Sequence, residues 1–248
     1  MNKLTHTIKK ILPNFLLIFA QRLKAFYKWD KYYHKSWSQE GEDLILARLF
    51  ENNAKGFYVD VGAHHPKRFS NTYLFYKKGW TGINIDAMPG SMKSFNKLRK
   101  RDINIEKPVS DKKQILTYYA FNESALNGFS KELSEERSNK NNGYDIIFEK
   151  DIETFTLEEI LDTNLPDNQE IDFLSIDVEG LDLMVLKSNN FEKYKPKIIL
   201  IEILSSSIFE ISNSEIAIHL IGLNYSIYAK AANTVIFTEN EFLKNNNK

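Results

Sequence analysis

Short apolar runs alternate with longer amphipathic stretches along most of the chain. The clearest apolar runs are residues 57–63, 81–86, 171–177 and 197–203, and each has an acidic residue at or near its end. Runs of this length, rich in β-branched and aromatic residues, are typical of buried parallel strands, and helical periodicity fills the stretches between them. We therefore predict an α/β protein with a Rossmann-like, mostly parallel, seven-stranded sheet and helices on both faces.

Weaker patterns complete the predicted sheet. Residues 103–110 have the pattern of a third strand, and residues 115–121 have the pattern of an extra strand. Residues 223–228 and 234–237 are predicted to form a C-terminal antiparallel hairpin that closes one edge.

Helix boundary signals lie between these runs. Ser38 is the predicted N-cap of a helix before the first strand, and Thr156 forms a capping box with Glu159. A further helix is predicted through residues 92–98, with basic residues that we expect on a solvated face. These basic residues are Lys93, Lys97, Arg99 and Lys100.

The chain is predicted to have one main domain with an appendage at each end. Residues 1–35 are a basic helical appendage, residues 36–243 are the main domain, and residues 244–248 are a disordered tail. Within the main domain, residues 122–150 are rich in Asn, Ser, Glu and Lys. A polar connection of this length is typical of a lid or a flexible insert.

The N-terminal appendage has apolar residues at helical spacing over residues 7–28, with basic residues between them. Its uninterrupted apolar part is about ten residues, too short to span a bilayer. A helix packed on its own domain, or on a second subunit in a homodimer, would explain this pattern. A basic amphipathic helix on an anionic membrane surface would explain it equally, and these interpretations stay open.

Composition narrows the functional classes. The chain has zero net charge, but residues 1–35 carry +7 and the remaining residues carry −7. This mildly acidic main part argues against nucleic acid as a partner. The chain has no cysteine, which excludes disulfides and thiolate metal sites. We expect a cytoplasmic protein, with the inner face of the membrane as the site of any peripheral contact.

Two strand ends carry residues suited to an adenosine-type ligand. Gly62 follows the first strand, and a Cβ there would stand between the backbone and whatever lies across the strand end. Asp86 ends the second strand 24 residues later and can accept hydrogen bonds from a ribose diol. A single glycine gives no close approach to a pyrophosphate, which argues against a nicotinamide dehydrogenase.

Five short segments, in this order along the chain, resemble the FkbM family of S-adenosylmethionine-dependent methyltransferases. The segments are residues 38–43, 59–63, 69–72, 79–82 and 176–180, within a resemblance that runs from about residue 37 to residue 204. The resemblance implies a class I methyltransferase fold and O-methyl transfer. It also implies a saccharide or small-molecule acceptor, in surface polysaccharide or nucleotide-sugar biosynthesis.

The resemblance also implies, position by position, which residues contact S-adenosylmethionine. They are Gln39, Asp60, Gly62, Ala63, Ser70, Asn71, Asp86, Ala87, Ser110 and Asp111. The residues around Gly62 would line the methionine end, those at Asp86 would hold the ribose, and Ser110 and Asp111 would face the adenine.

Methyl transfer to a sugar hydroxyl requires alignment of the hydroxyl and removal of its proton. In one route, His64 or His65 takes the proton. In the other, Asp177 and Glu202 hold Mg²⁺, which lowers the pKa of the hydroxyl. The positions of these two acidic residues resemble those of the metal ligands in catechol-type O-methyltransferases. Glu179 is a further candidate base or ligand.

Two alternative functions remain open. The same fold could transfer a methyl group to the nitrogen of an amino sugar. It could also be a non-catalytic module that binds S-adenosylmethionine or associates with a membrane.

Overall fold

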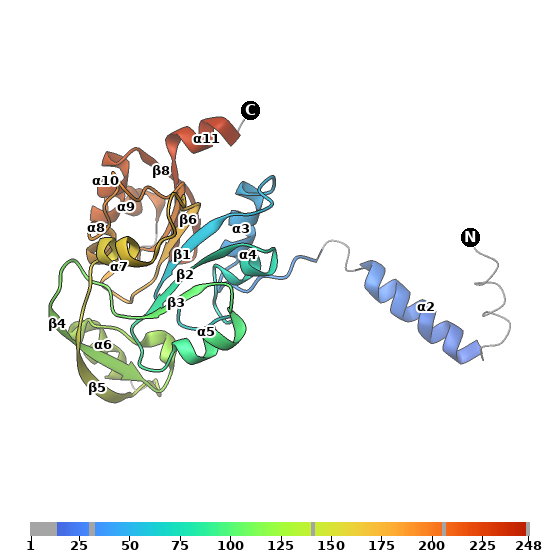
Figure 1. The fold of residues 1–248 in the computed structure, drawn as a ribbon. Helices are drawn as coiled ribbons and strands as arrows, with labels where there is room; N and C mark the ends of the chain where they lie inside the picture. The colour runs from blue at the N-terminus through green and yellow to red at the C-terminus, as the bar shows by residue number, and fades with distance from the viewer. Residues whose placement is uncertain (1–13, 30–32, 140–141, 205–206, 247–248) are drawn as a thin grey trace. The chain divides into compact units, whose positions relative to one another are not determined.

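A computed structural model describes residues 14–29, 33–139, 142–204 and 207–246 (Figure 1). The chain divides into two compact units, Met1–Lys35 and Ser36–Lys248. The described part of the first unit contains helix α2 (Asn14–Trp29), which overlaps the helical stretch that we predicted over residues 7–28 and ends one residue beyond it. Residues 7–13 lie outside the described residues. Over the described ranges, no helix has both the length and the apolar content needed to cross a bilayer.

Seven strands of the second unit form one sheet, in the order β3-β2-β1-β6-β7-β9-β8. The strands are β1 (Phe57–Val61), β2 (Thr81–Asp86), β3 (Ile103–Glu106), β6 (Phe173–Ile176), β7 (Ile198–Glu202), β8 (Tyr225–Ala231) and β9 (Thr234–Glu239). The first five pair in parallel, whereas β9 runs antiparallel to β7 and pairs with β8. The predicted mostly parallel sheet with a C-terminal hairpin is confirmed.

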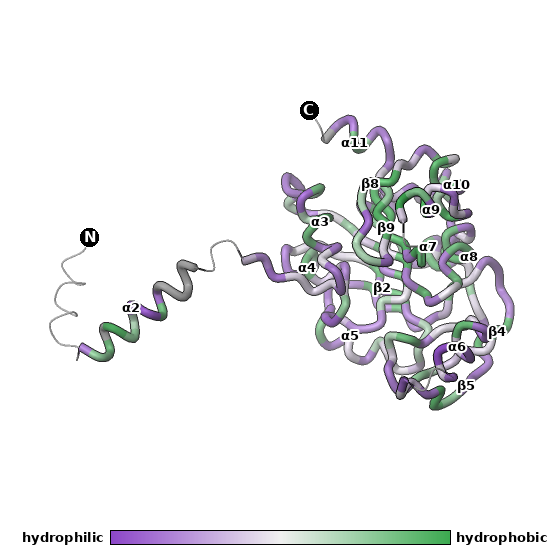
Figure 2. The backbone as a smooth tube through the Cα atoms, turned by 180° about the vertical axis from the view of Figure 1, so that it is seen from behind, coloured by the Kyte–Doolittle hydropathy of each residue, from purple (hydrophilic) through white to green (hydrophobic). Residues whose placement is uncertain are grey.

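Helices cover both faces of this sheet (Figure 1). They are α3 (Glu42–Leu49), α4 (Tyr73–Lys77), α5 (Met92–Leu98), α7 (Leu157–Asn164), α8 (Asp182–Lys187), α9 (Ile208–Ser212), α10 (Glu215–Gly222) and α11 (Asn240–Asn246). Strand side chains alternate between the faces: Val59 packs in the cluster that includes α7, α8 and α10, and Tyr58 packs in the cluster that includes α3 and α4. Figure 2 shows the hydrophobic strands inside the more polar connections.

A second, two-stranded sheet lies between β3 and α7 along the chain. Strand β4 (Ile115–Phe121) pairs antiparallel with β5 (Ile146–Glu153), and the 3₁₀ helix η2 (Ser124–Leu126) and helix α6 (Lys131–Ser138) lie between them. We call residues 115–153 the insert. Residues 122–150, which we expected to be a lid or a flexible segment, therefore contain η2, α6 and part of β5.

The start of helix α3 and the end of helix α11 differ from the sequence prediction. Helix α3 begins at Glu42 with Gly41 as its N-cap, and the hydroxyl of Ser38 accepts a hydrogen bond from the amide of Asp43 at 3.2 Å instead. The prediction of an N-cap at Ser38 was wrong by three residues. At the other end, α11 continues to Asn246, where we had expected disorder from residue 244, and residues 247 and 248 lie outside the described range.

Arg99 is fully buried, so the prediction that it lies on a solvated face was wrong. Its guanidinium donates to Asp102 at 2.8 Å, to the Tyr58 hydroxyl at 2.8 Å and to the Thr72 hydroxyl at 2.9 Å. Helix α5 ends at Leu98, and the non-helical backbone of Arg99 turns its side chain away from the basic face. The prediction failed because helical spacing no longer applies at that residue.

Candidate active site

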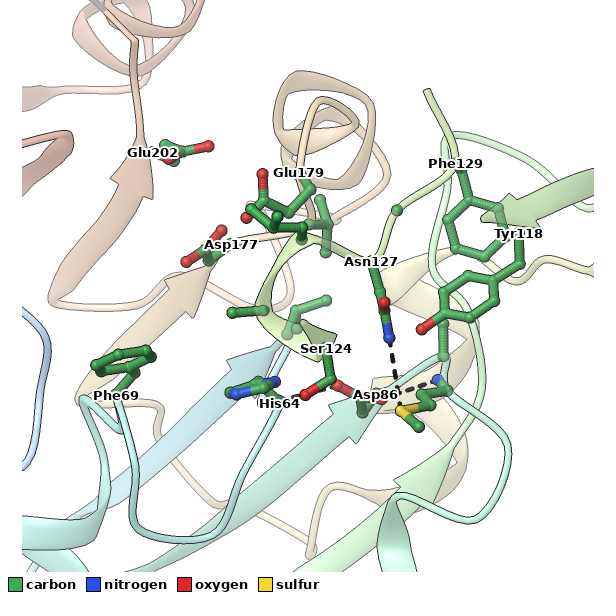
Figure 3. Close-up of a pocket in the computed structure, with 18 of the residues that line it drawn as sticks. His64, Phe69, Asp86, Tyr118, Ser124, Asn127, Phe129, Asp177, Glu179 and Glu202 are labelled. Atoms are coloured by element: carbon green, nitrogen blue, oxygen red, sulfur yellow. Dashed lines mark hydrogen bonds between the residues drawn. The ribbon is translucent and has the colours of Figure 1, made fainter. Parts of the chain in front are cut away.

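A cavity of about 440 Å³ opens at the carboxyl ends of the central strands (Figure 3). The residues that end or follow β1, β2, β6 and β7 line one wall, and residues of the insert line the facing wall. The strand-end residues are Val61, Gly62, Ile85, Asp86, Asp177 and Glu202. The topology thus brings together acidic residues that lie more than a hundred positions apart in the sequence.

Gly62 lies in this wall with a φ of +82°. A Cβ at this position would lie 1.7 Å from the backbone carbonyl oxygen of Asp177. Both the left-handed backbone and the close approach of the next strand end therefore require glycine. The atom that lies across the end of β1 is therefore the backbone oxygen of Asp177, the residue that follows β6. The sequence alone did not identify this atom.

Asp86 ends β2 at the floor of the cavity and is half-buried. Its carboxylate accepts the backbone amides of His64 at 2.9 Å and Met88 at 2.8 Å. Burial raises the pKa of Asp86, and the two amide donors oppose that rise. Each carboxylate oxygen has a second lone pair, so Asp86 can still accept hydrogen bonds from a ligand.

The insert supplies an aromatic slot opposite Asp86. Figure 3 shows Tyr118, Asn127 and Phe129 on this side of the cavity. Burial raises the pKa of Tyr118, and the nearby charge of Asp86 adds to this rise, so Tyr118 stays protonated at neutral pH. The Asn127 amide contacts the Met88 sulfur at 3.5 Å, which links the insert to the loop after β2. Tyr118 and Phe129 pack on each other, with ring centroids 5.1 Å apart, and together they offer an aromatic surface to the cavity.

Sequence reasoning missed these insert residues. They come from a stretch without a clear apolar period, and they reach the cavity through the pairing of β4 with β5 and of Tyr119 with Gly128. The unusual length and polarity of residues 122–150 was the one signal that marked the segment as functional.

Three acidic side chains lie at the opposite end of the cavity: Asp177, Glu179 and Glu202 (Figure 3). Glu179 accepts a hydrogen bond from Arg137 of α6 at 2.5 Å, which ties the insert to the loop after β6. Among the described residues, the carboxylates of Asp177 and Glu202 have no hydrogen-bond partner. These two side chains are therefore available to a ligand.

Mutual repulsion and burial shift the acid–base behaviour of this acidic end. Burial raises the pKa of Glu202 to about 7, and the charges of Glu179 and Asp182 add to the rise while Arg137 opposes it. Asp177 is exposed to the two cavities that it lines, and neighbouring protein surrounds its carboxyl group on the other sides. Desolvation by the surrounding protein raises the pKa of the Asp177 carboxyl well above its usual range, and repulsion by the charge of Glu202 is the next largest cause of this rise. The Glu202 carboxylate can therefore hold and release a proton near neutral pH.

A smaller cavity of about 80 Å³ shares Asp177 and Glu202 with the main one. Gln39 lines both cavities, and Asn71 lines the smaller one while its amide donates to the Ser175 hydroxyl at 3.1 Å. Asn233, which precedes β9, also lines both. The predicted contacts Gln39 and Asn71 therefore lie at the acidic end, together with the predicted Asp177 and Glu202.

The two histidines differ in their surroundings. His64 lines the main cavity with a φ of +52°, and its buried Nε2 has no hydrogen-bond partner among the described residues. Burial and the nearby Arg68 and His65 lower the pKa of His64, so it is neutral at neutral pH. His65 lies outside the cavity wall, and its Nδ1 accepts the backbone amides of Lys67 at 3.1 Å and Arg68 at 2.9 Å. His65 therefore shapes the loop.

The residues present do not fit the predicted Mg²⁺ site. Over the described ranges, no group of three or more His, Asp or Glu side chains is arranged to hold a metal ion. Asp177 and Glu202 supply two carboxylates, fewer than the protein oxygens expected of a dedicated site.

Several other predicted contacts do not line the main cavity. Asp60 is buried and accepts the Thr72 hydroxyl at 2.9 Å, and burial raises its pKa to about 6. Ala63 is buried against α5, and the Ser70 hydroxyl accepts the Tyr73 amide at the start of α4. These residues support the loop that carries His64.

Ser110 and Asp111, the predicted adenine contacts, come after β3 and also lie outside the cavity wall. Ser110 is fully buried and donates to Asp111 at 3.1 Å, and the Gln114 amide contacts both. Neither residue lines the cavity, whereas the preceding Val109 does. Ala87, next to Asp86, lines the cavity.

Comparison with known proteins agrees with this geometry. The family model described as the methyltransferase FkbM domain matches residues 60–226, which run from the end of β1 through the insert to the start of β8. A comparison with curated proteins finds no significant match. The matched region contains most of the cavity wall and covers more than half of the chain, and the chain therefore belongs to the FkbM family of methyltransferases.

Proposed function

We propose that the protein transfers the methyl group of S-adenosylmethionine to a hydroxyl group of a sugar. Family membership makes the chain a methyltransferase, and the family implies this donor. The observation that carries the proposal is the arrangement of the cavity: an acidic ribose acceptor and an aromatic slot lie at one end, and two unpaired carboxylates lie at the other.

The residues at the strand ends fit the donor. Asp86 would accept hydrogen bonds from the ribose hydroxyls, and the adjoining rings of Tyr118 and Phe129 would lie against one side of the adenine. Gly62 lines the cavity beside the end of β1, where the methionine part would lie. When bound, S-adenosylmethionine supplies an electrophilic methyl group on a positively charged sulfur.

The carboxylates of Asp177 and Glu202 act as the general base in this proposal. A sugar hydroxyl has a pKa far above neutral, so it must lose its proton to a base as it reacts. Glu202 titrates at about pH 7, which makes it a base that is present and effective at neutral pH. His64 is neutral and unpartnered but lies beside Asp86, at the ribose end. We therefore assign His64 to donor binding.

The charges of the cavity favour an acceptor without phosphate. Arg137 is paired with Glu179, and Arg68 is paired with Glu123 at 3.1 Å. The unpaired charges at the acidic end are therefore negative, and they would repel a phosphorylated sugar while accepting hydrogen bonds from hydroxyl groups. An amino sugar also suits this charge, so N-methyl transfer is the second candidate.

Two measurements test the proposal. Calorimetry should show binding of S-adenosylmethionine and of S-adenosylhomocysteine at micromolar to millimolar concentration. Incubation with a labelled methyl donor and a panel of neutral oligosaccharides, amino sugars and nucleotide sugars should then label a hydroxyl of a neutral saccharide. Label on an amino nitrogen would replace the O-methyl proposal. Binding without any transfer would favour a non-catalytic module, and no binding would exclude the proposed donor.

A further inference from the structure

Helix α2 carries a continuous group of exposed apolar side chains. Phe15, Leu16, Ile18, Phe19 and Leu23 are each between 38% and 68% exposed. Phe15, Phe19 and Leu23 follow one another at intervals of four residues, so they lie along one side of the helix, and Leu16 and Ile18 flank them. Figure 2 shows this alternation of hydrophobic and hydrophilic positions along α2.

The charged residues of α2 are all basic, and the segment around the helix is strongly basic. The helix contains no acidic residue, and Lys24 lies on the side opposite Phe15. Arg22 lies on the apolar side itself, between Phe15 and Ile18, where its long side chain can extend its charge beyond the apolar surface. In the whole segment of residues 1–35, eight Lys and Arg residues face one acidic residue, Asp30. An apolar stripe with purely basic surroundings is typical of helices that lie on membranes.

The described length of α2 is too short to span a membrane. Sixteen helical residues extend about 24 Å, which is shorter than the hydrocarbon core of about 30 Å. A helix of this kind lies in the plane of the headgroups, with its apolar side chains toward the acyl chains.

We infer that α2 binds the surface of an anionic lipid bilayer and holds the methyltransferase domain there. A lipid surface offers both the apolar interior that Phe15 and Phe19 require and the negative charge that Arg22 and Lys24 require. A second copy of α2 would bring two basic helices together and oppose their pairing. The main part of the chain carries −7 and would be repelled by anionic lipid, so membrane binding depends on the N-terminal segment. This inference does not depend on the identity of the acceptor.

Vesicle flotation of the full chain tests the inference. The protein should float with vesicles of phosphatidylcholine and phosphatidylglycerol at a ratio of 7 to 3, and remain at the bottom of the gradient with pure phosphatidylcholine. Raising the salt to 1 M should reduce flotation, because salt screens the charges. The variant Arg22→Gln/Lys24→Gln should reduce the bound fraction at least about tenfold, since each basic residue near the surface contributes.

A matched pair of variants separates the role of α2 from that of exposed apolar residues in general. Phe15→Glu/Phe19→Glu should abolish flotation, whereas Ile218→Glu/Ile221→Glu on α10 should leave it unchanged. Ile218 and Ile221 are 61% and 50% exposed, similar to the residues of α2. Circular dichroism and binding of S-adenosylhomocysteine should be the same for the wild type and the α2 variant, which shows that the main domain is intact.

Three results would overturn the inference. Equal flotation with neutral and anionic vesicles would show that charge does not direct the contact. A dimer in light scattering that becomes a monomer in Phe15→Glu/Phe19→Glu, without flotation of either protein, would assign α2 to a second copy. A lower Tm of that variant, again without flotation of the wild type, would assign α2 to its own domain.

Discussion

The backbone carbonyl oxygen of Asp177 occupies the space that a side chain at Gly62 would fill. The two residues follow β1 and β6, which are neighbouring strands with no intervening strand in the sheet. Their contact brings the start of the loop that carries His64 against the acidic end of the cavity. Gly62 therefore determines how closely the loop after β1 approaches Asp177 and the acidic end of the cavity.

Replacing Gly62 by alanine should destabilise the protein and weaken donor binding. We expect a loss of at least about 3 kcal/mol in the free energy of unfolding, because a clash is added to left-handed strain. Gly143→Ala is the matched control: Gly143 has a φ of +81° but open space around its Cβ position, so it should lose only about 1 kcal/mol. Denaturant unfolding measures both. Equal losses would show that the contact with Asp177 contributes nothing.

Asp86→Ala should weaken the binding of S-adenosylhomocysteine by about 10- to 100-fold, because hydrogen bonds to a charged group contribute about 1.5–3 kcal/mol. Isothermal calorimetry measures the affinity, and a melting curve checks that the loop held by Asp86 is intact. Asp111→Asn should leave the affinity unchanged, since Asp111 lies outside the cavity wall. A weaker affinity only in the Asp111 variant would place the adenosine elsewhere.

Glu202→Gln should lower kcat by about 100-fold or more with little change in donor affinity, as expected for the loss of a general base. Because the base must be deprotonated, activity of the wild type should rise with pH through about 7 and then level off. Asp177→Asn should act in the same direction. His64→Gln should change kcat by less than about tenfold. A large loss of kcat in the histidine variant, with full activity in both carboxylate variants, would assign the base to His64.

Exhaustive chelation should leave methyl transfer unchanged. The described part of the chain provides two free carboxylates at the acidic end and no group of three metal-binding side chains. The measurement is the initial rate before and after treatment with EDTA and gel filtration. Loss of activity that Mg²⁺ restores would contradict the carboxylate route and re-establish the metal that the sequence resemblance implied.

Arg99→Met should destabilise the protein by about 3 kcal/mol, or about 10 °C in Tm, because it leaves Asp102 buried without its charge partner. Lys100→Met, on the adjacent exposed residue, should stay within about 0.5 kcal/mol of the wild type. Thermal unfolding of the two variants checks both values. Similar Tm values for Arg99→Met and the wild type would show that the buried ion pair is dispensable.

The sheet was predictable because its strands are apolar on both faces. β1 and β6 are buried along their whole length, so their runs stand out in the sequence. β5 was missed because six of its eight residues are exposed, which leaves no apolar alternation to detect. The N-cap of α3 was missed because Gly41 supplies a backbone conformation and no capping side chain.

The candidate site was predictable only where it lies on strand ends. The topology of an α/β sheet brings Asp86, Asp177 and Glu202 to one edge, and sequence order is enough to infer this. The far wall depends on tertiary contacts of the insert, such as the pairing of Tyr119 with Gly128, which no local pattern encodes. Burial of Arg99 likewise depends on partners from other elements, including Tyr58 of β1.

A crystal structure with S-adenosylhomocysteine tests the central claim most directly. The ribose hydroxyls should lie within hydrogen-bond distance of the Asp86 carboxylate, with the adenine between the loop after β3 and the aromatic residues of the insert. Density for the ligand at any other place, with the space between Asp86 and Tyr118 filled by solvent, would contradict the assignment of the donor site and of the acidic end beside it.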